Sequence, residues 1–380
     1  MRISSNFDSG AIEVVSLADP ENIRLRLRPD NAAEFRQWFH YRVQGAAGQH
    51  LVMCFENAAE AAYPGGWPGY RALASYDRQN WFRVAATRYE DGHLIVEHSP
   101  ERNSVYYAYF EPYSHERHLD LLGRVEMSPF AEVHNLGASV EGRDIDVVVV
   151  GRPRPDKQPV WITARQHPGE TMASWFIEGL LERLLDGADP VSRRVRELAT
   201  LYVVPNMNPD GAIRGNLRTN AAGANLNREW QSPSRARSPE VLLVRDEMER
   251  TGVSLFLDIH GDEELPYVFF STAEEVPGFS AQALARQSKL IAAFKQASPD
   301  VQTEHGYQAG RFGEEMLSLA SKWVAHRFGC VALTLEMPFK DNANLPDGVS
   351  GWSAARSRIL GSAALVAVLA HLSEGLSRTD

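Results

Sequence analysis

The chain has 380 residues with 39 basic and 49 acidic side chains, which gives a net charge of −10. This length predicts two domains, or one large domain with a companion. Hydrophobic residues at 44% and charged residues at 23% are ordinary globular values and exclude wholesale disorder. The acidic balance argues against a nucleic-acid partner, because such proteins usually present a basic face.

The termini and cysteines indicate the compartment. The start, MRISSNFDSG, lacks the basic and apolar segments of a secretory signal, and no run of about 18 apolar residues predicts a membrane span. The most apolar stretch, Ile359 to Leu372, is interrupted by Ser362 and His371 and predicts an amphipathic helix that closes the fold. Cys54 and Cys330 lie in apolar runs, as buried thiols of a reducing compartment do. We therefore expect a soluble, cytoplasmic protein with no membrane partner.

Residues 1–125 alternate short β-type runs with turn clusters such as Pro64-Gly65-Gly66 and Asp91-Gly92. Seven strands at this spacing predict an antiparallel β-sandwich domain. The predicted strands are Ala11–Leu17, Ile23–Leu27, Phe35–Val43, His50–Glu56, Phe82–Thr87, His93–His98 and Ser104–Phe110.

Residues 126–380 change to apolar strands separated by helix-length segments. Continuous runs such as DVVVV and LFLDI predict strands covered on both faces, so this half is an α/β domain with a mixed sheet sandwiched by helices. The predicted strands are Ile145–Val150, Val160–Arg165, Leu201–Pro205, Ser254–Ile259, Tyr267–Phe270 and Val331–Leu335. The predicted helices are Thr171–Leu185, Pro239–Glu249, Ser280–Gln296, Glu314–Arg327 and the terminal one.

Two histidines and a glutamate suggest a metal site. His167 and Glu170 follow a predicted strand across a Pro-Gly turn, and His260 ends another strand. Side chains at the carboxyl ends of strands gather at one edge of an α/β sheet. Two imidazoles and one carboxylate leave a fourth position for water, as in a catalytic zinc site. Taken singly, Glu170 is more typical of a helix cap, and His260 of a core histidine.

Other polar residues predict the chemistry around such a metal. Glu336 ends the apolar strand CVALTL, where a buried carboxylate needs a role or a partner. Beside a zinc-bound water it would be a natural general base. Arg218 and Arg228 lie in loops after the strand TLYVVP, and guanidinium groups hold carboxylates bidentately. Each of these residues alone also fits an exposed surface charge.

Five motifs in this order, HPGE, NPDG, NLNREW, DIHG and TLEMP, resemble those of zinc metallocarboxypeptidases related to carboxypeptidase A. The runs RQHPGETMASW and NPDGAIRGNLRTNAAGANLNREW, and the β-rich start with NFDSGAIEVV, resemble the cytosolic carboxypeptidase branch in particular. The resemblance covers about residues 5–340 and implies a zinc-dependent enzyme that removes the C-terminal residue of peptides or protein tails.

The resemblance also implies a role for each matched residue. His167, Glu170 and His260 would bind one Zn²⁺, and Glu336 would be general base and later proton donor. Arg218 would polarise the scissile carbonyl, while Asn227 and Arg228 would grip the terminal carboxylate of the substrate. Relatives of carboxypeptidase A close a mobile tyrosine over the substrate, and Tyr307 is the nearest candidate, although its surroundings match poorly.

The substrate preference rests on a hypothesis. In this fold the region shortly before the Glu336 strand builds the pocket for the departing side chain, and Arg311 or Lys322 would give it a basic floor. Such a floor favours C-terminal glutamate or aspartate, and the eukaryotic members of the branch act on glutamate tails. Lys322 also fits a solvent-facing position on its predicted helix.

Two alternatives remain open from the sequence. An aspartoacylase-like zinc amidohydrolase of small acylated amino acids would use the same His-x-x-Glu and His set, without needing the NPDG and NLNREW loops. A non-catalytic module that binds acidic tails would lack at least one ligand or the base, and here all four groups are present.

Overall fold

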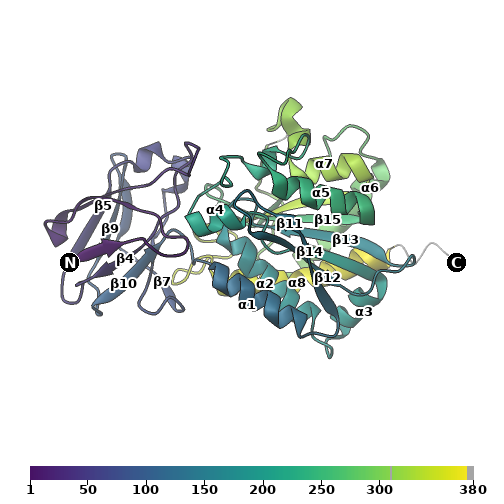
Figure 1. Ribbon diagram of the computed structural model, residues 1–380, viewed down its shortest axis with the longest axis horizontal. Helices are drawn as coiled ribbons and strands as arrows, with labels where there is room; N and C mark the ends of the chain where they lie inside the picture. Colours follow the sequence, from purple (N-terminus) through teal and green to yellow (C-terminus); the bar gives the residue numbers. More distant parts are fainter. Residues whose placement is uncertain (309, 375–380) are drawn as a thin grey trace.

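The computed structural model describes residues 1–308 and 310–374. Figure 1 shows two bodies side by side, a β-rich one built from the first part of the chain and a larger α/β one built from the rest. The first contains two five-stranded sheets, and the second a seven-stranded sheet with helices on both faces. The division predicted between residues 125 and 126 stays a prediction.

The first body is a β-sandwich with orders β1-β4-β10-β6-β7 and β2-β3-β5-β9-β8. Most of its strand pairs are antiparallel, but β3 and β5 pair in parallel, which the sequence analysis did not foresee. The predicted run Phe82–Thr87 is divided between two strands, and β1 and β6 were not predicted. The strands are β1 (Arg2–Ser4), β2 (Glu13–Ser16), β3 (Ile23–Arg26), β4 (His40–Gln44), β5 (Leu51–Phe55), β6 (Leu73–Ser75), β7 (Trp81–Arg83), β8 (Thr87–Glu90), β9 (His93–His98) and β10 (Ser104–Ala108).

The seven-stranded sheet has the order β11-β12-β14-β13-β15-β17-β16. Its four central strands, β14, β13, β15 and β17, run parallel, so their carboxyl ends meet at one edge, while the outer pairings are antiparallel. The central strands are almost wholly buried, as their β-branched runs predict. The strands are β11 (Ala131–Ala138), β12 (Asp144–Val150), β13 (Gln158–Ala164), β14 (Ala199–Val204), β15 (Leu255–Asp262), β16 (Phe269–Ser271) and β17 (Val331–Pro338).

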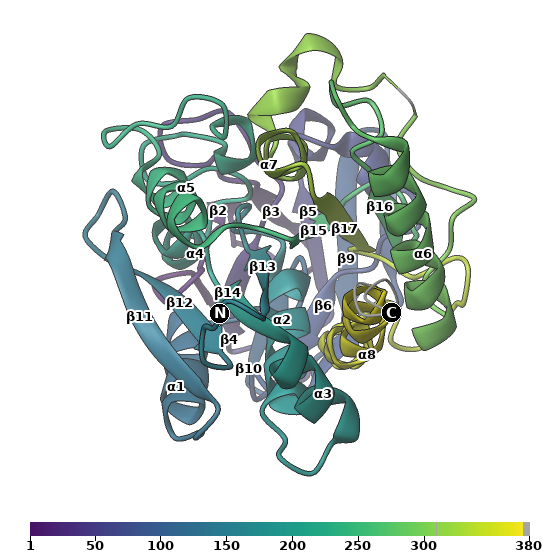
Figure 2. The same cartoon turned by 90° about the vertical axis from the view of Figure 1, so that its right-hand side faces the viewer.

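Helices cover both faces of this sheet, with α2, α3 and α8 on one face and α5 and α7 on the other (Figure 2). Helices α2 and α8 cross closely because each has a glycine where the backbone of the other helix passes. A Cβ at Gly361 would lie 1.9 Å from the Phe176 carbonyl oxygen, and one at Gly179 would lie 2.1 Å from that of Arg358. The helices are α1 (His115–Glu126), α2 (Thr171–Leu184), α3 (Pro190–Leu198), α4 (Pro209–Arg214), α5 (Pro239–Thr251), α6 (Ala281–Ala297), α7 (Ala320–Phe328) and α8 (Ala354–Ser373).

Several helical segments differ from the sequence prediction. The predicted helix Glu314–Arg327 is a 3-10 helix (Gly313–Ser318) followed by α7, because Leu319 between them has extended backbone. The Asn-Pro-Asp-Gly motif starts α4, a helix that was not predicted, and the Asn208 side chain there accepts a hydrogen bond from Gly211 N. Helices α1 and α3 were not predicted.

Within the described residues, α8 is the one helix whose length and composition would allow it to cross a membrane. Half of its apolar window is buried, and the helix packs against α2, α3 and α6. Its burial is that of a core helix of this domain.

Candidate active site

Three residues from two strand ends converge on one point. His167 and Glu170 lie in the turn between β13 and α2, and His260 lies in β15. Their ligand atoms all lie within 4.8 Å of one another, and all three side chains are buried. His167 Nδ1 is 2.6 Å from Glu170 Oε1, and His260 Nδ1 is 2.8 Å from Glu170 Oε2. Two imidazole nitrogens and a carboxylate facing one another form a donor set that suits zinc.

The backbone of this turn is held in a strained conformation. Arg165, directly after β13, has a φ of 64°, which is unusual for a residue with a side chain. Its buried guanidinium donates hydrogen bonds to the Pro168 carbonyl oxygen (2.7 Å) and to Ser174 Oγ in α2 (2.9 Å). The side chain therefore ties both ends of the turn together and fixes the direction in which His167 and Glu170 point.

The ring nitrogens on the far side of the cluster have partners of their own. His167 Nε2 lies 3.0 Å from Asn225 Oδ1, and His260 Nε2 lies 2.8 Å from Asp258 Oδ2. Asp258 also accepts a hydrogen bond from Gln166 Nε2 (2.7 Å), and Gln166 Oε1 accepts one from the Trp230 indole (2.8 Å). Such partners orient imidazoles toward a metal and fix which nitrogen is free.

Electrostatics prepare two of the three candidate ligands, His167 and Glu170, for metal binding. Burial lowers the pKa of His167 to about 4, so its imidazole is neutral and keeps a lone pair to donate. Burial alone would raise the pKa of Glu170, but the two imidazoles outweigh it and hold the pKa below its usual value. A neutral imidazole and an ionised carboxylate are the forms that bind zinc. Burial alone would lower the pKa of His260, but the carboxylates of Asp258 and Glu170 outweigh it and raise the pKa, so this imidazole has to release a proton when a metal binds.

Glu336 lies beside the cluster, because β17 and β15 pair in parallel with Glu336 opposite His260. Its side chain is buried, and burial raises its pKa to about 8. Oε1 lies 3.1 Å from the Tyr307 hydroxyl, which shares its one hydrogen between Glu336 and Asp262 Oδ2 (2.8 Å), whereas Oε2 has no hydrogen-bond partner among the described residues. A buried carboxylate with one free oxygen is suited to proton transfer. The sequence named Tyr307 only as a candidate lid, and that role stays a prediction.

Arg218, Asn227 and Arg228 all line the same cavity, of about 180 Å³, as the metal cluster and Glu336. The Arg218 side chain is 12% exposed, and its Nη1 lies 3.9 Å from Glu170 Oε1. Asn227 Oδ1 accepts a hydrogen bond from Ala320 N (2.8 Å), which fixes that side chain at the start of α7. The structure thus brings together the three residues that the sequence placed in loops.

The two candidates for a basic floor differ. Arg311 lines the cavity, with its guanidinium 4.0 Å from the centre of the Tyr307 ring. Lys322 does not line it, because its side chain is buried on α7, so both the floor position and the solvent-facing position considered for it are wrong. The cavity lining also includes Ser271 and Thr334, from the paired strands β16 and β17.

Several lining residues were missed by sequence reasoning. Tyr63 comes from the β-sandwich domain and lines the cavity beside Arg218, while Asp262 and Glu263 follow His260 directly. Their proximity to DIHG was a usable signal for the two acidic residues. No local pattern marks Tyr63, because it reaches the cavity from a loop of the other domain.

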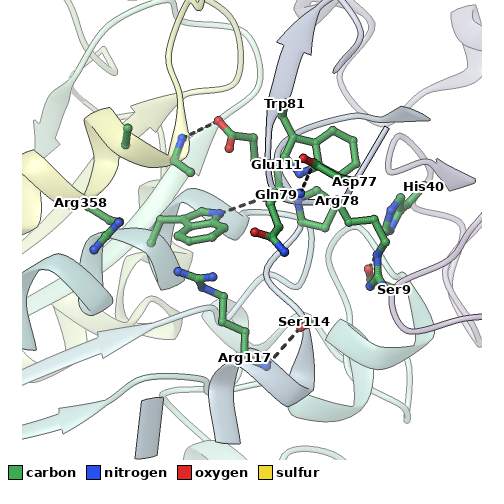
Figure 3. Close-up of a pocket in the computed structure, with 14 residues that line it drawn as sticks. Ser9, His40, Asp77, Arg78, Gln79, Trp81, Glu111, Ser114, Arg117 and Arg358 are labelled. Carbon is green, nitrogen blue, oxygen red and sulfur yellow. Dashed lines mark hydrogen bonds between the residues drawn. The ribbon is translucent and has the colours of Figure 1, made fainter. Parts of the chain in front are cut away.

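A larger cavity, of about 650 Å³, lies elsewhere between the two domains (Figure 3). Trp81 and His40 of the β-sandwich lie on one side of it, and Arg117 and Arg358 of α1 and α8 on the other. None of the candidate metal-binding, general-base or substrate-binding residues lines it, and all of these candidates except His260 line the smaller cavity.

Family models match both parts of the chain. The model described as the cytosolic carboxypeptidase N-terminal domain matches residues 3–110, and the zinc carboxypeptidase model matches residues 124–349. Because the second match spans more than half of the chain, the protein belongs to the zinc carboxypeptidase family. This confirms the family predicted from the motifs, the peptidase activity and the zinc cofactor.

Solved structures agree with this family. The metallo-carboxypeptidase from Burkholderia cenocepacia is 56% identical, with a TM-score of 0.96, over 98% of this chain and 99% of that one. The metallo-carboxypeptidase from Pseudomonas aeruginosa, solved with (2-guanidinoethylmercapto)succinic acid, is 46% identical, with a TM-score of 0.94, over 99% of this chain and 100% of that one. These similarities confirm the predicted fold class.

A more distant relative is cytosolic carboxypeptidase 6 of Mus musculus, 25% identical over 314 residues. The alignment covers 73% of this chain and 56% of the mouse protein, so the chain matches little more than half of that relative's length.

Proposed function

We propose that this metallocarboxypeptidase binds its zinc ion through His167, Glu170 and His260 and uses Glu336 as general base. The observation that supports this most directly is the convergence of the three ligands within 4.8 Å beside a carboxylate with a free oxygen. When bound, zinc supplies Lewis-acid polarisation of a carbonyl and lowers the pKa of water toward roughly 7.

Glu336 moves the proton of the reaction. Its free Oε2 takes a proton from water as the water oxygen forms a bond to the scissile carbonyl carbon. Glu336 then delivers that proton to the amide nitrogen as the C–N bond breaks, so that the shortened peptide and a free amino acid leave. The hydrogen bond from Tyr307 to Oε1 leaves Oε2 as the oxygen that transfers the proton.

Three further residues bind the substrate around this step. Arg218, buried next to Glu170, stabilises the negative charge that develops on the carbonyl oxygen. Asn227 and Arg228 hold the terminal carboxylate of the peptide, because both line the cavity and Arg228 carries a guanidinium fork. Together they place the last peptide bond, rather than an internal one, at the metal.

We further propose a preference for an acidic C-terminal residue, with Arg311 as the cationic partner of its side chain. Arg311 lines the cavity and makes no ion pair with any residue that the structure describes. The Ser271 hydroxyl, which lines the cavity, favours a polar side chain over an aromatic one, since it would lose water without replacement.

A basic C-terminal residue is the second candidate. Asp262, Glu263 and Glu264 also line the cavity, and the Pseudomonas relative was solved with a molecule that carries a guanidino group. We retain peptide hydrolysis over the amidohydrolase and binding-module alternatives because the chain belongs to the zinc carboxypeptidase family.

The test is a set of peptides that differ only in their last residue, Glu, Lys or Phe, assayed with the zinc-loaded enzyme. We expect the Glu peptide to have the highest kcat/KM, and Arg311→Met to remove that advantage while leaving the Phe peptide unchanged. Cleavage of the Phe peptide as fast as the Glu peptide would refute the acidic preference, and faster cleavage of the Lys peptide would establish the second candidate.

A cytoplasmic location is proposed on two grounds. The more distant relatives of this protein carry the name cytosolic carboxypeptidase, and both of its cysteines are free and buried. Fractionation of cells that produce the full chain, followed by immunoblotting, would test it, and an extracytoplasmic pool would contradict it.

A further inference from the structure

The loop that carries Arg218 is held by a carboxylate from the other domain. Asp30 of the β-sandwich accepts hydrogen bonds from three successive backbone amides, those of Leu217 (2.5 Å), Arg218 (2.8 Å) and Thr219 (2.8 Å). It accepts a fourth from Thr219 Oγ1 (3.0 Å). Three amides that point at one anion fix the backbone dihedrals of the residues between them. The position of the Arg218 Cα is thereby set from outside its own domain.

The neighbouring residues strengthen this contact. Asn31 Nδ2 donates to the Ala221 carbonyl oxygen (2.7 Å), and Asn216 Nδ2 donates to Asn31 Oδ1 (2.6 Å). Gly223, with a φ of 74°, allows the loop to come close, because a Cβ there would lie 2.2 Å from the Ala32 carbonyl oxygen. The two segments therefore fit backbone against backbone.

The β-sandwich domain also encloses the Arg218 side chain. Its guanidinium carbon lies 5.3 Å from the centre of the Tyr63 ring and 5.9 Å from that of Phe35. Tyr63 is fixed in turn by Gln37, which donates to its carbonyl oxygen (3.0 Å) and accepts from its amide (2.9 Å). These aromatic contacts direct the guanidinium without using its N–H groups.

Asp30 holds the backbone of Arg218 and leaves its side chain free. The carboxylate is 5% exposed, and its four hydrogen bonds go to amides and a hydroxyl, not to the guanidinium. A direct Asp30–Arg218 ion pair would occupy the donors that the carbonyl oxygen of the substrate needs. Holding the main chain avoids this competition.

From this geometry we propose that Asp30 is a positioning residue for the arginine that stabilises the oxyanion, so that the β-sandwich domain completes the active site. The inference rests on the proposed role of Arg218. Misplacing a catalytic group by about 1 Å costs on the order of 10²-fold in rate. Asp30→Asn puts an NH₂ group among the three amide donors, so the loop must shift.

The experiment is a double-mutant cycle on the full-length, zinc-loaded enzyme. We expect Asp30→Asn to lower kcat by roughly 10²-fold while KM and zinc content stay within about threefold of wild type. In an Arg218→Ala background, the same substitution should leave kcat unchanged, because the group it positions is already gone. A merely structural role would lower kcat by the same factor in both backgrounds.

Asp77→Asn is the matched control. Asp77 also belongs to the β-sandwich and accepts backbone hydrogen bonds, but from its own loop, at Gln79 N (2.8 Å) and Asn80 N (2.7 Å). We expect this variant to keep kcat within about threefold of wild type.

Thr219→Val is a second variant that tests the role of Asp30 even if Asp30→Asn does not fold. It removes one of the four hydrogen bonds, and we expect kcat to fall roughly 2- to 10-fold in the wild type and not at all in Arg218→Ala. Full activity of Arg218→Ala would reject the role proposed for Arg218. An inactive Arg218→Ala combined with unchanged kcat in Asp30→Asn, or equal losses in both backgrounds, would overturn the inference about Asp30.

Discussion

Replacing Glu336 by glutamine tests the chemistry most directly, because the amide keeps the size of the side chain and removes its basicity. The side chain is buried beside His260, and its Oε2 has no hydrogen-bond partner among the described residues. A positioned general base contributes about 10²–10⁴-fold. At 1.36 kcal/mol per tenfold, this is roughly 3–5 kcal/mol of transition-state stabilisation. We expect kcat to fall by that factor while zinc stays bound.

The assay measures release of the C-terminal amino acid alongside zinc content by elemental analysis. His260→Ala is the contrasting variant, since it removes a proposed ligand and should lose both zinc and activity. Near-full turnover by Glu336→Gln, after removal of contaminating wild-type enzyme, would refute the assignment of the base. Loss of zinc from Glu336→Gln would place Glu336 among the ligands instead.

Two predictions concern stability. Burial raises the pKa of Glu240 from 4.5 to about 7, so its contribution to stability is complete below about pH 4.5 and is lost as the pH rises through about 7. A shift of about 2.5 corresponds to roughly 3 kcal/mol, so Glu240→Gln should be more stable than wild type at pH 8 by up to that amount and equal at pH 4.5. Urea unfolding at both pH values would show this, and identical pH profiles would contradict it. Gly361→Ala should destabilise the protein by about 1–3 kcal/mol or more, because its methyl group would collide with the Phe176 carbonyl oxygen. Gly123→Ala, exposed on α1 with nothing within 4 Å of the added Cβ, should be neutral or stabilise by about 0.4–1 kcal/mol. A Gly361→Ala variant with the same unfolding midpoint as wild type would show that α2 and α8 can move apart at no cost.

The metal cluster could be predicted from sequence because strand ends impose its geometry. His167 follows β13, while His260 and Glu336 lie near the carboxyl ends of β15 and β17. These strands are parallel neighbours, so their carboxyl ends meet whatever the rest of the chain does. Apolar runs of β-branched residues are a strong local signal for a buried strand. The residue that ends such a run is therefore expected at the carboxyl edge of the sheet.

The contributions of the β-sandwich domain could not be predicted in the same way. Asp30 and Tyr63 lie in loops whose residues, Pro29-Asp30-Asn31 and Tyr63-Pro64-Gly65, have ordinary turn composition. Their partners lie far away in the chain, 189 residues in the Asp30–Thr219 bond, and no periodicity links such segments. Helix α1 was missed for a similar reason. Most of its residues are polar, and its few apolar ones are explained only by its packing against β11 and α4.

This contrast between strand ends and loops bears on how the active site is built. The proposed ligands stand at or near a rigid parallel sheet, where neighbouring strands hold them to each other directly. Arg218 stands in a loop that follows α4, and a loop alone does not hold a donor to within the fraction of an ångström that oxyanion stabilisation requires. The buried carboxylate of Asp30 supplies the missing constraint through the Arg218 backbone. A catalytic arginine on a loop needs a second layer of structure against it, and for the role that we propose for Arg218 the β-sandwich domain is that layer.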